Sequence, residues 1–234
     1  MTLHSQDFLG TVLPLPSVVH WSGGLAQLSI RRFPAQFTLS ATDLAKLLPD
    51  EKLRLARSTR KNKTQLGLAA RLQLRQMLAN LLVCAPSDIV LTNSPDGRPQ
   101  LHSDHGAAAL SLDFSISYTP QGFAICIAND RRVGVDLQRF NPRQESNFEA
   151  LFGGYRQRRH ATTFMPQEIW TRMEAYGKMQ GEGLAHGMHR LYRIALRPQI
   201  ADIGCHFIDF RFGSGISLSI CLSGAAAGPV CFLS

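Results

Sequence analysis

The sequence of 234 residues lacks an unbroken apolar segment of the roughly 18 residues that a membrane span needs. Residues 1–20 have no lysine or arginine ahead of their apolar stretch, so we expect no secretory signal. Only five cysteines are present, an odd number scattered mostly through apolar segments, which favours free thiols over a disulfide framework. They are Cys84, Cys126, Cys205, Cys221 and Cys231. These features predict a cytoplasmic protein without a membrane partner.

Several common functional signatures are also missing. No G-x-S-x-G segment occurs, which argues against a hydrolase elbow. The pairs His102/His105 and His186/His189 have no cysteine or carboxylate at a spacing that would complete a zinc site, so we interpret them as surface or loop histidines. Residues 213–215 (GSG) lack the rest of a dinucleotide-binding loop. No groove-reading motif or aromatic platform supports a nucleic-acid partner.

The chain has more basic than acidic residues and enough apolar residues for a core. Hydrophobic residues make up 44% and charged residues 18%, values typical of a globular protein. The net charge is +8, which suits an anionic cofactor, an acidic protein, phosphates or no anionic partner at all. The basic run at residues 57–63 is either a solvated face or a surface that meets a phosphate or a partner helix.

Hydrophobic periodicity predicts a chain that combines helices with strands joined in hairpins. A strand at residues 25–33 precedes a short helix capped at 40–43, a basic helical stretch opening at Pro49, and a long helix with an apolar stripe from Leu66 to Leu81. A turn follows at residues 94–97. Strands are then predicted at residues 114–118, 122–128 and 133–138.

The second part of the chain repeats the order of strand, helices and hairpin. We interpret residues 141–163 as a loop with short helical pieces, and expect a helix from Pro166 to about Gln180, stopped by glycine. Residues 206–212 and 216–222 alternate as a hairpin. Two similar halves are therefore predicted, residues 1–130 and 131–234, with the second half carrying the chemistry described next.

The first chemistry-bearing segment is the strand at residues 134–138 (GVDLQ). Asp136 and Gln138 are two residues apart, so their side chains point to the same face of the strand. A carboxylate and an amide on one face can offer oxygen ligands to a hard cation. The alternative is a strand-end aspartate that caps the following turn.

The second segment is the predicted helix after Pro166. Trp170, Glu174 and Lys178 recur at four-residue steps and therefore share one helix face. Residues 181–184 (GEGL) end the helix. An isolated E-x-x-x-K pair is usually a surface ion pair, so that alternative stays open from spacing alone.

Together these segments resemble the 4′-phosphopantetheinyl transferases of the surfactin-synthetase-activating (Sfp) type. That family carries a G-[IV]-D-[IVL]-E strand and then W-x-x-K-E-[AS]-x-x-K followed by G-x-G-L. Residues 97–101 (GRPQL) and 114–118 (FSISY) are similar to two further family segments. Arg71 with Leu74 and Arg75 matches an R-x-x-L-R helix.

The resemblance implies an α+β fold, namely a pseudo-dimer of two similar α+β halves with antiparallel sheets and the active site between them. It implies a Mg²⁺-dependent holo-[acyl-carrier-protein] synthase that moves the phosphopantetheine arm of coenzyme A to a serine of an acidic acyl or peptidyl carrier protein. The carrier would serve fatty-acid, polyketide or nonribosomal peptide synthesis. One chain would contain the whole site, so we expect a monomer.

The resemblance also implies residue roles. Asp136 and Glu174 would bind the metal, with Gln138 beside them. Glu174 is the candidate base, and Lys178 would bind the transferred phosphate and neutralise the leaving group. The expected coenzyme A contacts are Arg71, Arg98, Ser117, Tyr118 and Lys178.

Three residues depart from the family pattern. Gln138 replaces a glutamate, Tyr118 replaces a histidine, and Met173 replaces a lysine that would place a cation in the site. These departures keep an alternative open, namely a catalytically degenerate module that binds coenzyme A or a carrier protein on the same fold.

Overall fold

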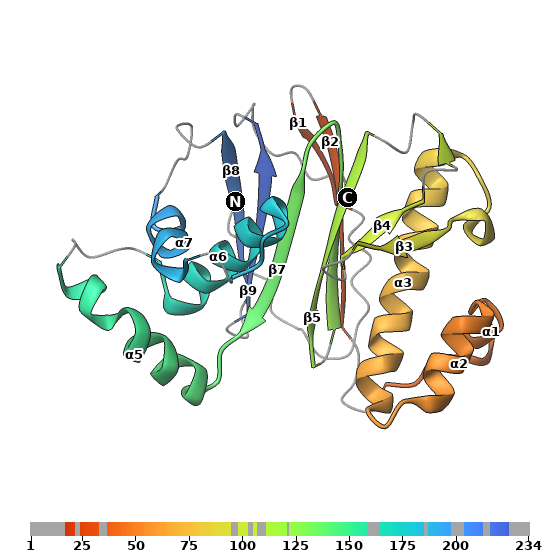
Figure 1. Ribbon diagram of the computed structural model, residues 1–234, viewed down its shortest axis with the longest axis horizontal. Coiled ribbons are helices and arrows are strands. Elements are labelled where there is room, and N and C mark those ends of the chain that lie inside the picture. Colours follow the sequence, from red (N-terminus) through yellow and green to blue (C-terminus); the bar gives the residue numbers. More distant parts are fainter. Residues whose placement is uncertain are drawn as a thin grey trace.

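Two antiparallel sheets face each other in the middle of the molecule, and helices cover both outer sides (Figure 1). The computed structural model describes residues 17–21, 24–32, 37–94, 98–102, 105–106, 111–120, 122–158, 164–184, 187–197, 204–212 and 216–224. The combination of helices with antiparallel sheets confirms the predicted α+β class.

The first sheet has four strands and the second has three. The first has the order β1-β2-β6-β5, with bounds Ser17–Trp21, Gly24–Arg32, Gly122–Asn129 and Leu112–Thr119. The second has the order β7-β9-β8, with bounds Val133–Arg139, Ile216–Ser223 and Cys205–Phe212. A separate pair consists of β3 (Leu91–Asn93) and β4 (Pro99–Leu101). Strands β1, β3 and β4 were not predicted, whereas the six predicted strands correspond to β2, β5, β6, β7, β8 and β9.

The core between the sheets combines small residues from one sheet with larger ones from the other. Ala124 and Cys126 on β6 belong to the same buried cluster as Leu218 and Ile220 on β9. The period-2 pattern predicted for β9 is confirmed by this packing, because its alternate residues are the ones that enter the cluster. The hairpin turn at residues 213–215 and the turn residues 95–97 lie outside the described part of the chain.

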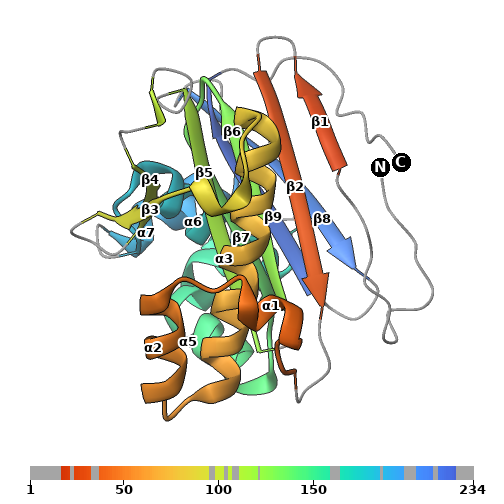
Figure 2. The same ribbon diagram turned by 90° about the vertical axis from the view of Figure 1, so that its right-hand side faces the viewer.

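Helices α1 (Ala41–Ala45), α2 (Pro49–Arg57) and α3 (Lys61–Leu82) precede the 3₁₀ turn Pro86–Asp88. Figure 2 shows α3 along the outer face of the first sheet. Its predicted stripe is confirmed, since Leu74 and Leu78 are fully buried against that face. The predicted cap is also present, with the Asp43 amide donating to Ser40 Oγ at 3.1 Å.

Helices α5 (Pro142–Arg158), α6 (Pro166–Gln180) and α7 (Met188–Ala195) cover the second sheet. The prediction of a loop at residues 141–163 is wrong, because most of this range forms α5. Its few apolar residues find partners far away in the sequence: the Phe152 ring stacks on Tyr192 of α7 at a centroid distance of 4.5 Å. The bounds predicted for α6 are confirmed, and Gly181 ends it with a φ of 81°.

Other sequence-based predictions stand as follows. Cys84, Cys126, Cys205 and Cys221 are free thiols, whereas Cys231 lies outside the described residues. Within the described helices, none is both long and apolar enough to cross a bilayer. Strands β6 and β7, on either side of the predicted divide, lie in different sheets. The division into two domains and the pseudo-dimer relation remain predictions.

Candidate functional site

A large cleft of about 1680 Å³ brings together the residues that the motifs singled out. It is lined by strands β5 and β7 and by helices α3 and α6. All eight predicted site residues line it: Arg71, Arg98, Ser117, Tyr118, Asp136, Gln138, Glu174 and Lys178. Trp170 lines it as well, so the predicted shared face of Trp170, Glu174 and Lys178 on α6 is confirmed.

Asp136 has a buried carboxylate whose hydrogen bonds are concentrated on one oxygen. Its Oδ1 accepts from Lys178 Nζ at 2.7 Å and from Ser117 Oγ at 2.7 Å. Lys178 Nζ also donates to the Val135 carbonyl at 3.1 Å. Asp136 Oδ2 accepts no hydrogen bond from the described residues. Since these partners lie on α6 and β5, the alternative that Asp136 merely caps the next turn is wrong.

Glu174 sits one helical turn before Lys178 with a half-buried carboxylate. No residue in the described ranges donates a hydrogen bond to it. Burial raises the pKa of Glu174, the Asp136 carboxylate raises it further, and Lys178 lowers it. Lys178 forms its ion pair with Asp136 at 2.7 Å, so the alternative of a surface pair between Glu174 and Lys178 is wrong.

The carboxylate oxygens of Asp136 and Glu174 fit a hard divalent cation such as Mg²⁺. Asp136 Oδ2 and the Glu174 carboxylate are both available, and after burial the Asp136 charge is the second cause of the raised pKa of Glu174. Gln138 lies further along the same strand and lines the same cleft. Three-residue clusters of His, Cys, Asp and Glu are absent from the described ranges, but Mg²⁺ is held by one or two carboxylates and water.

Arg98 is engaged within the protein. Its guanidinium pairs with Asp113 at 2.8 Å and donates to the carbonyls of Phe114 and Val133 at 3.1 and 3.0 Å. It also donates to the main-chain carbonyl of Lys178. The predicted role in binding a nucleotide phosphate therefore competes with a set of internal acceptors on β5, β7 and α6. In this arrangement Arg98 holds the end of α6 against both sheets.

Ser117 is likewise engaged internally. Its side chain is buried, donates to Asp136 and accepts from the Leu137 amide at 3.1 Å. This arrangement does not favour the predicted phosphate contact. Tyr118, the next residue, is 46% exposed and lines the cleft, as expected for a ligand contact.

One further expectation needs correction. Met173 is fully buried in the core between α5, α6 and α7. Having methionine in place of lysine here therefore does not remove a cation from the cleft. Arg75 of the R-x-x-L-R pattern is also buried and forms two hydrogen bonds with Glu51, at 3.0 and 2.9 Å. Arg75 thus joins α2 to α3, whereas Arg71 lines the cleft.

The basic run at residues 57–63 forms part of the cleft wall. Arg57, Arg60 and Lys63 are exposed and line it. Within this run, residues 58–60 separate helix α2 from helix α3. Of the two interpretations of this run, the structure favours a surface available to an anionic ligand or partner.

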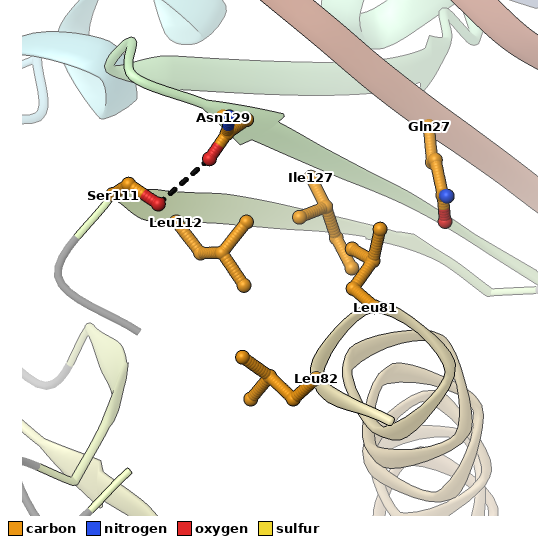
Figure 3. A pocket seen from close by; sticks show the side chains of 7 residues that line it. All are labelled: Gln27, Leu81, Leu82, Ser111, Leu112, Ile127 and Asn129. Atoms are coloured by element: carbon orange, nitrogen blue, oxygen red, sulfur yellow. Dashed lines mark hydrogen bonds between the residues drawn. The ribbon is translucent and has the colours of Figure 1, made fainter. Parts of the chain in front are cut away.

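A second, smaller pocket of about 220 Å³ lies at the C-terminal end of α3 (Figure 3). Leu81, Leu82 and Leu112 supply much of its wall, and Ser111 donates to Asn129 at 2.7 Å. None of its lining residues is charged. The charged side chains that the motifs singled out therefore belong to the large cleft.

Sequence reasoning missed the residues that hold α6 in place. Arg172 donates to Asp209 at 2.7 Å and to the carbonyls of Ala195 and Arg197. Its guanidinium also lies 4.0 Å from the centroid of the Phe164 ring. The only sequence signal was an arginine on the inward-facing side of a helix, which could be recognised only once the apolar side was known.

Two comparisons with known proteins agree with the motifs. Residues 34–131 match a family described as "4′-phosphopantetheinyl transferase, N-terminal". A protein of Synechocystis sp. (strain ATCC 27184 / PCC 6803 / Kazusa), provisionally named a 4′-phosphopantetheinyl transferase, is 27% identical over 161 residues. That match covers 63% of this chain and 62% of the relative, less than two thirds of the relative's length. The predicted resemblance to the 4′-phosphopantetheinyl transferase superfamily is confirmed, while the Sfp type remains a prediction.

Proposed function

We propose that this protein is a 4′-phosphopantetheinyl transferase that moves the phosphopantetheine arm of coenzyme A to a serine of an acyl or peptidyl carrier protein and releases 3′,5′-ADP. The observation that carries the proposal is the convergence of Asp136, Glu174 and Lys178 from β7 and α6 in one cleft. The family match and the similar cyanobacterial protein support the same reaction class.

In this reaction the serine oxygen forms a bond to the phosphorus that carries the pantetheine arm. The bond from that phosphorus to the bridging oxygen of the pyrophosphate breaks, and the serine proton passes to a base. Glu174 suits the role of base, because its carboxylate lines the cleft and accepts no hydrogen bond from the described residues. Lys178 can stabilise the charge that develops on the transferred phosphate and on the leaving 3′,5′-ADP.

Asp136 and Glu174 would hold Mg²⁺, with Gln138 within the same cleft, and the ion would supply charge neutralisation at the pyrophosphate. The exposed wall of Arg57, Arg60 and Lys63 would receive coenzyme A phosphates or the acidic carrier. The proposal includes a cytoplasmic location, where free thiols persist, and a monomer, because a single chain supplies the cleft.

The test is a transfer assay with coenzyme A, Mg²⁺ and a panel of apo carrier proteins, followed by intact-mass spectrometry. We expect at least one carrier to gain the mass of one phosphopantetheine. Glu174→Gln should lose roughly 100-fold or more in turnover. Glu182→Gln is the matched control, since Glu182 is an exposed carboxylate just beyond α6 and should tolerate the same change.

Two outcomes would contradict this proposal. Near-wild-type turnover in Glu174→Gln would remove Glu174 from the mechanism. Tight coenzyme A binding without any mass gain on the carriers would favour the degenerate binding module, which the replacements at Gln138 and Tyr118 keep as the second candidate.

A further inference from the structure

Strands β5 and β7 are the facing edges of the two sheets, and side chains of β5 supply the acceptors that join them. Each acceptor receives one main-chain N–H of β7, and the pairs advance by two residues along both strands. The pairs are Asp113 Oδ2 with Val133 N at 2.8 Å, Ser115 Oγ with Val135 N at 3.0 Å, and Ser117 Oγ with Leu137 N at 3.1 Å. We call these three pairs the β5–β7 seam. They satisfy N–H groups that an edge strand would otherwise leave without partners.

Ser117 forms one hydrogen bond more than Ser115, the other hydroxyl of the seam. Its oxygen accepts the Leu137 N–H and its single proton is donated to Asp136 Oδ1 at 2.7 Å. Ser115 accepts from Val135, but no carboxylate receives its proton among the described residues. Both serines are almost fully buried, at 3% and 6% exposure. The two residues therefore form a natural pair in which only one contacts a predicted metal ligand.

The contact with Ser117 determines how the Asp136 carboxylate is oriented. Rotation about the terminal bond of an aspartate is soft, so hydrogen bonds decide the position of its two oxygens. Ser117 and Lys178 both donate to Oδ1 at 2.7 Å, which leaves Oδ2 for another partner. Without the serine hydroxyl only Lys178 remains, and one donor restricts the rotation less than two.

We propose that Ser117 is a positioning residue for the cation site, which holds Asp136 with Oδ2 available to a divalent cation and makes no contact with coenzyme A. The inference rests on the proposed function, because it takes Asp136 as a ligand of that cation. Removal of a group that orients a metal ligand typically lowers the metal affinity 10- to 100-fold. Because Lys178 still holds Oδ1, the loss for Ser117→Ala should lie at the lower end, about 10-fold.

The experiment measures Mn²⁺ binding by the electron paramagnetic resonance signal of the free ion, with the full chain and without coenzyme A. We expect Ser117→Ala to raise the Kd for Mn²⁺ about 10-fold. Ser115→Ala, which removes a comparable buried hydroxyl from the same seam, should stay within about twofold of the wild type. Ser117→Thr, which restores the hydroxyl, should regain most of the affinity. If Ser117→Ala does not fold, Ser117→Cys supplies a weaker donor of similar size and should give an intermediate Kd.

A second measurement separates positioning from ligand contact. Coenzyme A affinity in EDTA should be the same in Ser117→Ala and the wild type, because the buried hydroxyl does not touch that ligand. A loss of metal-free coenzyme A affinity in Ser117→Ala would overturn the proposal in favour of the phosphate contact predicted from the sequence.

The remaining outcomes are also decisive. An unchanged Kd for Mn²⁺ in Ser117→Ala, or an equal loss in both alanine variants, would overturn the positioning role while leaving phosphopantetheinyl transfer intact. Equal Mn²⁺ affinity in Asp136→Asn and the wild type would overturn both this inference and the assignment of Asp136 as a ligand. The carrier assay tests the transfer reaction independently of these results.

Discussion

Glu174 occupies an environment that disfavours its own charge. It is half-buried, it lies near the negative charge of Asp136, and Lys178, the cation that lowers its pKa, is paired with that aspartate. Functional carboxylates often carry such a cost, because the same features that destabilise the ion prepare it to bind a cation or a proton. The loss of folding stability caused by the Glu174 charge is measurable in the protein without metal.

We expect Glu174→Gln to be more stable than the wild type near neutral pH when both are unfolded in EDTA. The folded-state pKa of Glu174 lies above its ordinary value of 4.5, so the folded protein retains this proton to higher pH than the unfolded chain. The loss of folding stability due to ionised Glu174 is therefore absent at low pH, grows as the pH rises through 4.5, and is complete above the raised pKa. Melting temperatures of both proteins between pH 4 and 8 check this.

Glu182→Gln is again the control, and its difference from the wild type should not follow the same pH profile. A Glu174→Gln variant that is less stable than the wild type at neutral pH would contradict the environment described for this carboxylate.

At the scale of elements, the placement of α6 depends on its close approach to β7. Gly134 lies where a Cβ atom would overlap the Ala175 carbonyl and come within 2.6 Å of the Met179 amide nitrogen. Both obstacles are main-chain atoms, so no side-chain movement can relieve them. The glycine of the GVDLQ segment is thus required by packing, and the aspartate two residues later is placed by the same strand.

We expect Gly134→Ala to destabilise the protein by about 3 kcal/mol, because α6 must move away from β7. Gly67→Ala is the matched control in α3, where a Cβ would meet nothing within 4 Å; it should stabilise by about 0.5–1 kcal/mol. Urea unfolding measures both. Equal effects of the two substitutions would show that the approach of α6 to β7 does not limit the packing.

At the scale of the whole molecule, a net charge of +8 is combined with a cleft that has an exposed basic wall. Arg57, Arg60 and Lys63 line this wall from the end of α2 and the beginning of α3. Exposed charges of one sign accelerate the approach of an oppositely charged partner, and salt screens the effect over about 8–10 Å. An acidic carrier protein would experience this attraction.

We expect the carrier KM to rise as salt increases from low to physiological ionic strength and above. Arg60→Gln, on the cleft wall, should raise the KM at low salt and flatten its salt dependence. Arg143→Gln, an exposed position on α5 outside the cleft lining, should change both much less. A KM independent of salt in the wild type would exclude electrostatic docking of the carrier.

The amino-acid sequence by itself determined the elements whose pattern is local. The bounds of α6, the buried stripe of α3 and the alternation in β9 follow from periodicity and end signals within a few residues. The family resemblance carried by the motifs also predicted that Asp136, Glu174 and Lys178 share one site, and all three line one cleft.

Only the tertiary structure decided which partner each polar side chain has. Arg98 and Ser117 carry family motifs that suggested phosphate contacts, yet their hydrogen bonds go to other strands and to α6. Met173 lies next to Glu174 in sequence but faces the core. Helix α5 depends on Tyr192 from a helix further along the chain. In each case the deciding contact joins residues that are distant in sequence, and local periodicity carries no information about such a partner.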